Sequence, residues 1–172
     1  VDDEDEAEED ANIRKQKQLE QRMRSDPDFA FKHFVTQNTE ACSDDVMEKV
    51  KVLSLAHKLD RKQQIKMIVY GVLQYEQNDY KLLMQSIRKY RTVLEAFTLL
   101  KNDTHIFLAY MEEMIMHKAG GDALLHHAYH IFNCLYDEDI IGEDEVMEWY
   151  HSKHGQNPFT IIRGDEYQTI RN

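Results

Sequence analysis

Apolar side chains recur at helical spacing over most of this 172-residue chain, and this pattern restricts the fold more than any other feature. The clearest stripe follows positions i, i+3, i+4, i+7 and i+8, at Ile65, Ile68, Val69, Val72 and Leu73. No segment alternates apolar and polar residues over a useful length, as a half-buried strand would. The chain also has only six Gly and two Pro, too few for the many tight turns of a sandwich or barrel. The sequence therefore predicts an all-α fold.

The predicted helix starts are spaced in a way that suggests repeats. Asp26 followed by Pro27 is a common N-cap and first turn, and Asp103 or Thr104 is expected to cap a later helix. Every second predicted start falls near residues 27, 60, 103 and 142. Irregular repeats of about 40 residues are typical of stacked helical hairpins of the HEAT kind. We therefore expect an α-solenoid of stacked antiparallel hairpins with about seven to nine helices; a compact bundle is the alternative.

Composition divides the chain into four predicted parts. Residues 1–10 carry eight carboxylates and no base, so residues 1–12 are predicted to form a disordered acidic linker. Such a linker suggests that the chain is a piece of a longer protein. Residues 13–25 are expected to form a linker helix or a docked arm, residues 26–155 the helical domain, and residues 156–172 a C-terminal tail.

The overall charge and hydropathy exclude several classes of function. A net charge of −11 disfavours direct nucleic-acid binding, because phosphate contacts need Lys and Arg. No stretch approaches the roughly 20 apolar residues that span a bilayer, and the acidic start is unlike a signal peptide. We expect a cytoplasmic monomer that does not bind membranes and whose partners are basic.

The strongest charge asymmetry lies between Lys118 and Lys153. Residues 119–152 contain eight acidic residues and no Lys or Arg. A solvated helix face is the ordinary interpretation, but such faces usually mix charge signs, and a wholly negative surface favours a basic partner. The predicted partner-binding residues, which we call the acidic box, are Tyr136, Asp137, Glu138, Asp139, Glu143, Asp144, Glu145, Glu148, Trp149 and Tyr150.

A small basic patch, Arg88, Lys89 and Arg91, precedes the acidic box. It could be a solvated helix end whose cations favour the helix dipole, or a second partner-binding patch. Because its charge is opposite to that of the acidic box, we predict that the two serve different partners.

The histidines are the residues that most suggest chemistry. His126 and His130 have the i, i+4 spacing of two zinc ligands on one helix face. However, the HExxH motif needs a Glu after the first His, and His127 occupies that position. A metal-dependent enzyme is therefore the less favoured alternative. The sequence gives no catalytic residue, no metal site and no cofactor that we would propose.

Two segments resemble one known family. The stretches IRKYRTVLEAF (87–97) and LYDEDIIGEDEVMEWY (135–150) are similar to the C-terminal HEAT domain of the two-tryptophan type that closes eukaryotic translation initiation factor 5. The same domain closes the epsilon subunit of the exchange factor for initiation factor 2 and the regulatory proteins that mimic factor 5. These two proteins are the alternatives within the family.

The resemblance implies a non-catalytic scaffold of translation initiation. Its expected partners are the lysine-rich boxes of the initiation factor 2 beta subunit, the c subunit of initiation factor 3, and initiation factor 1. The arginine and zinc ribbon through which factor 5 promotes GTP hydrolysis belong to its N-terminal domain and are not found in these 172 residues.

The C-terminal tail departs from the family pattern. The family usually ends in a second box, where Pro-Phe-Ile-x-Trp-Leu leads into a run of Glu. Residues 157–162 keep Pro158 and Phe159 but lack the Trp, and only Asp165 and Glu166 stand in for the acids. A divergent tail of this kind predicts a smaller acidic surface.

Overall fold

The computed structural model describes residues 2–73, 79–115 and 124–151. Within these ranges the regular elements are nine α-helices and one 3₁₀ helix, and no strand is present. They are α1 (Asp2–Ser25), α2 (Pro27–Gln37), α3 (Ser43–His57), α4 (Arg61–Val72), α5 (Tyr80–Lys89), α6 (Arg91–Ala96), α7 (Lys101–Glu113), η3 (Leu125–His127), α8 (Ala128–Asp137) and α9 (Glu143–His151). The predicted all-α class is confirmed.

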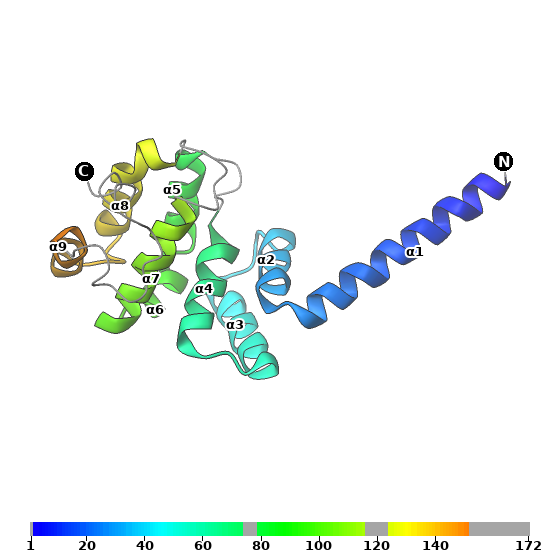
Figure 1. Cartoon of the computed structure of the whole chain (residues 1–172), viewed down its shortest axis with the longest axis horizontal. Coiled ribbons are helices and arrows are strands. Elements are labelled where there is room, and N and C mark those ends of the chain that lie inside the picture. The colour runs from blue at the N-terminus through cyan, green and yellow to red at the C-terminus, as the bar shows by residue number, and fades with distance from the viewer. Residues whose placement is uncertain (1, 74–78, 116–123, 152–172) are drawn as a thin grey trace.

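From α2 onward the helices stack in two layers (Figure 1). In one layer α4 packs against α2, α7 against α4, and α9 against α7. In the other, α3 contacts α6, and α5 contacts both α6 and α8. The helices of the first layer, α2, α4, α7 and α9, are those that begin near the predicted starts at residues 27, 60, 103 and 142. The chain is therefore solenoid-like, as expected from the interval of about 40 residues.

Local capping explains several of the helix starts. The side chain of Asp26 accepts a hydrogen bond from the Phe29 amide at 3.1 Å, with Pro27 in the first turn. Asp60 forms a reciprocal capping box with Gln63 at the start of α4. These side chains satisfy amide groups that have no partner within the helix.

The predicted cap of α7 is wrong. The helix begins at Lys101, with Leu100 in the N-cap position. Asp103 is buried, and its Oδ2 atom accepts a hydrogen bond at 3.0 Å from Arg61 Nε. Thr104 donates through its hydroxyl to the carbonyl oxygens of Thr98 and Leu100. Both polar side chains thus make contacts that fix α7 in place instead of capping it.

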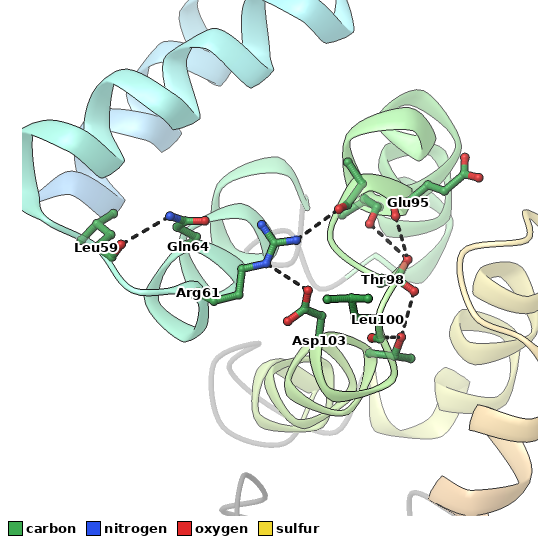
Figure 2. A network of polar contacts seen from close by, with 10 residues as sticks. Leu59, Arg61, Gln64, Glu95, Thr98, Leu100 and Asp103 are labelled. Atoms are coloured by element: carbon green, nitrogen blue, oxygen red, sulfur yellow. Dashed lines mark hydrogen bonds and ion pairs between the residues drawn. The ribbon is translucent and has the colours of Figure 1, made fainter.

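Figure 2 shows how Arg61 joins three helices. Besides binding Asp103 on α7, it donates from Nη2 to the Ala96 carbonyl at the end of α6, at 3.3 Å. Its guanidinium carbon also lies 4.3 Å from the centroid of the Phe97 ring. The first residue of α4 is therefore held against both α6 and α7.

The helix α1 extends away from the stack (Figure 1). In the structure α1 includes residues 2–12 together with residues 13–25, for which the sequence predicted a disordered linker followed by a helix or docked arm. Glu and Ala are good helix formers, and acidic side chains near an N-terminus favour the helix dipole, so the acidic segment suits a helix. Contact with α2 is made at the other end, where Met23 packs on the core and Arg22 lies over the Phe29 ring. The division of the chain into four parts stays a prediction.

Candidate partner-binding surface

The acidic box spans the end of α8, the link that follows, and α9. Two buried residues of that link, Ile140 and Ile141, anchor it to the core. Just before them, Asp139 adopts a left-handed backbone conformation with φ of 56°, which Asp tolerates better than most residues. This turn ends α8 and, because the two isoleucines point inward, the polar residues on either side lie at the surface.

One edge of the acidic box contacts the predicted basic patch. Arg88 Nε lies 3.5 Å from Glu138 Oε1, and Arg91 Nε donates a hydrogen bond of 2.7 Å to the Glu138 backbone carbonyl. The basic patch and the acidic box, which were predicted to serve different partners, are therefore adjacent. Lys89 is exposed, with its ammonium 5.3 Å from the centroid of the Tyr90 ring.

The other end of the acidic box is also paired with cations from earlier in the chain. Glu148 on α9 accepts from Lys101 Nζ at 2.7 Å, and its second oxygen lies 3.1 Å from His105 Nε2. The hydrogen bond from Lys101 lowers the pKa of the Glu148 carboxyl, and the same bond raises the pKa of Lys101. Glu148 thus also links α9 to α7.

Between these two paired ends lie acids without such partners. We call Asp139, Glu143, Asp144 and Glu145 the central acidic surface. None of these side chains makes an ion pair with the described residues, and all are exposed except the half-buried Glu145. Beside them, Tyr136 is 44% exposed, and Asp137 accepts from the Asn133 amide at 3.2 Å. The four carboxylates of the central acidic surface are thus not held in ion pairs by the described part of the chain.

Some predicted residues cannot be placed. The backbone of Trp149 and Tyr150 belongs to α9, but their side chains lie outside the described residues. The divergent C-terminal tail, including Pro158, Phe159 and the acids Asp165 and Glu166, lies outside them as well.

The histidine motif does not form the expected helix face. His126 lies in the 3₁₀ turn η3, whereas His130 belongs to α8, which begins at Ala128. The His127 ring stacks on Tyr80 with a centroid distance of 3.8 Å, and His130 lies 5.6 Å from the same ring. Among the described residues no three His, Cys, Asp or Glu side chains are grouped so that they could hold a metal ion. His127 and His130 therefore pack with an aromatic ring on α5.

The cations that pair with the acidic box were not predicted as its partners. Arg88, Lys101 and His105 reach it from positions 43 to 50 residues earlier in the chain. A search for opposite charges at i, i+4 cannot find such contacts. The repeat interval, which places α7 next to α9 in one layer, is the sequence feature that could have indicated the contacts of Lys101 and His105 with Glu148.

The described part of the chain is thus a stack of short helices that presents several carboxylates without an ion pair on one surface. The chain is 28% identical over 135 residues to eukaryotic translation initiation factor 5 of Caenorhabditis elegans. This match covers 78% of the chain but only 29% of that relative. No family model matches the chain. No solved structure matches it either. None of the helices in the described ranges is both long and apolar enough to cross a membrane.

Proposed function

We propose that this chain is a non-catalytic binding domain related to translation initiation factor 5, and that it binds lysine-rich protein segments through the central acidic surface. The observation that carries the proposal is the absence of ion pairs at Asp139, Glu143, Asp144 and Glu145 within the described residues. Several unpaired carboxylates on one short stretch attract a segment that presents several ammonium groups.

The paired residues at the two ends limit this surface. Glu138 and Glu148 already contact cations of the chain, so they are less available to a partner than the four central acids. A lysine-rich segment would therefore centre on the α8–α9 link and the first turn of α9. The positive end of the helix dipole at the start of α9 opposes an approaching cation. The negative charge of Glu143, Asp144 and Glu145 at the same place is larger, so the net charge still favours binding.

The proposed partners follow from the similarity to factor 5. The lysine-rich boxes of the initiation factor 2 beta subunit are the first candidate, because their chemistry fits the central acidic surface. The c subunit of initiation factor 3 and initiation factor 1 are further candidates within the same assembly. If the chain instead belongs to an epsilon subunit of the exchange factor or to a factor 5 mimic, we propose that the same central acidic surface binds the lysine-rich segment.

The proposal is tested by calorimetry with a lysine-rich peptide from the initiation factor 2 beta subunit. Asp144→Lys combined with Glu145→Lys should weaken binding at least tenfold, because several attractive contacts become repulsive. The matched control is Glu40→Lys with Glu48→Lys, which changes the net charge equally on the exposed surface of the first hairpin. The control should melt close to the wild type, since exposed charges contribute about 0–1 kcal/mol, and a thermal melt verifies that the variant at Asp144 and the half-buried Glu145 is folded.

Two outcomes would contradict the proposal. One is unchanged affinity in the Asp144 and Glu145 variant, and the other is an equal loss in the control. Wild-type affinity should also fall between low and physiological salt, where the Debye length is about 8 Å.

A further inference from the structure

Lys101 contacts the acidic box at the edge of the proposed partner site. Its Nζ atom lies 2.7 Å from Glu148 Oε1, while His105 Nε2 lies 3.1 Å from Oε2 of the same carboxylate. The side chains of Lys101 and Glu148 remain 65% and 45% exposed. The ion pair is therefore open to a competing cation from solvent.

The chemistry of this contact defines what could replace Lys101. A lysine of a bound segment carries the same ammonium group, with the same three donors, and can reach the same carboxylate oxygen. Exchange of one ammonium for another leaves Glu148 paired, and an exposed ion pair is weak enough to be exchanged. Lys101 also lies in the field of Asp144 and Glu145, which act on it in the same direction as Glu148. Its charge therefore offsets part of the negative potential that attracts a basic segment.

We propose that Lys101 is an internal competitor of the partner: it occupies the Glu148 carboxylate in the free chain, and a lysine of the bound basic segment takes its place. This inference rests on the proposed function, because it concerns the same surface. Lys101 then lowers the affinity for a basic segment in two ways, by occupying one carboxylate and by reducing the local negative potential. The matching contact at the other edge, Arg88 with Glu138, is longer, at 3.5 Å. Lys101 is thus the better-defined competitor.

A double-mutant cycle tests this inference with the lysine-rich peptide. Affinity is measured for the wild type, Lys101→Gln, Glu148→Gln and the double variant. We expect Lys101→Gln to bind about two- to fivefold more tightly than the wild type, which corresponds to the strength of an exposed ion pair. The gain should shrink in the Glu148→Gln background to the part that comes from the local potential, because the two residues are in direct contact.

Two further variants separate competition from a general charge effect. Lys81→Gln removes the same charge from an exposed position on α5 and should change the affinity less than Lys101→Gln does. Lys101→Arg keeps the ion pair and should bind like the wild type. Thermal melts verify that each variant is folded, as expected for exposed side chains.

The outcomes distinguish this inference from the proposed function. If the wild type binds the peptide but Lys101→Gln binds no more tightly than Lys81→Gln, Lys101 is not a competitor and the inference is overturned. A gain that is undiminished in the Glu148→Gln background overturns it as well. If the wild type does not bind the peptide at all, the proposed function fails, and the inference fails with it.

Discussion

The carboxylate of Asp103 is a buried acceptor whose partner lies 42 residues earlier in the chain. Replacing Asp103 with Ala should lower the free energy of unfolding by about 1–3 kcal/mol, because Arg61 loses a charged hydrogen-bond acceptor. The loss should be smaller in an Arg61→Met background, with a coupling of at least about 0.5 kcal/mol. Urea unfolding of the four proteins measures this coupling. Additive effects would show that Asp103 acts only on the dipole at the start of α7.

Asp103 also shows why part of the structure could not be predicted from local sequence. An Asp near a helix start gives the same local signal whether it caps the helix or binds a distant arginine. Where the partner is local the prediction succeeds, as at Asp26, which accepts from the amide three residues ahead; Asp60 and Asp79 cap their helices through local amides in the same way. Only the tertiary contact with Arg61 decides the role of Asp103.

At the scale of the helix, Gly71 sets how closely α4 approaches α2. A Cβ atom at this position would lie 2.3 Å from Cδ1 of Phe31, whose side chain is fully buried. Ala has a higher helix propensity than Gly by about 1 kcal/mol, but overpacking costs about 1–3 kcal/mol. We therefore expect Gly71→Ala to lower the free energy of unfolding. The loss should shrink in a Phe31→Leu background, which removes the ring. A stabilised Gly71→Ala protein would contradict this packing. Chemical denaturation measures both effects.

At the same scale, the acids of the site could be predicted from the sequence, whereas the cations that other helices contribute could not. The acids of α9 are adjacent in sequence, so their shared surface was predictable from the run of carboxylates. The cations that bind Glu138 and Glu148 come from α5, α7 and the start of α6, so local charge patterning made the whole box look unpaired. As a result, ten residues were predicted to form the site, whereas the described contacts leave five acids without an ion pair: the four central acids and Asp137, which accepts a hydrogen bond from Asn133.

For the whole molecule, the repeat interval was the most informative sequence feature. Helix starts recur because each hairpin buries its apolar stripe against the next, so the interval reflects the stacking of layers. The predicted starts near 27, 60, 103 and 142 correspond to α2, α4, α7 and α9, which contact one another in that order. The path of α1 away from this stack could not be predicted in the same way, because its few apolar residues give no clear stripe.

The position of α1 leads to a prediction about the stability of the whole chain. Residues 3–18 are all exposed, and α1 contacts α2 near Met23, so removal of residues 1–18 should leave the packed helices intact. We expect the melting temperature of this truncated chain to stay within about 2 °C of the full chain, because surface changes usually contribute less than 0.5 kcal/mol. Met23→Ala changes a residue that packs on the core and should lower the melting temperature by about 2–5 °C. Scanning calorimetry of both variants beside the full chain measures the difference. A drop of more than about 5 °C after truncation would mean that residues 1–18 pack on the helical stack.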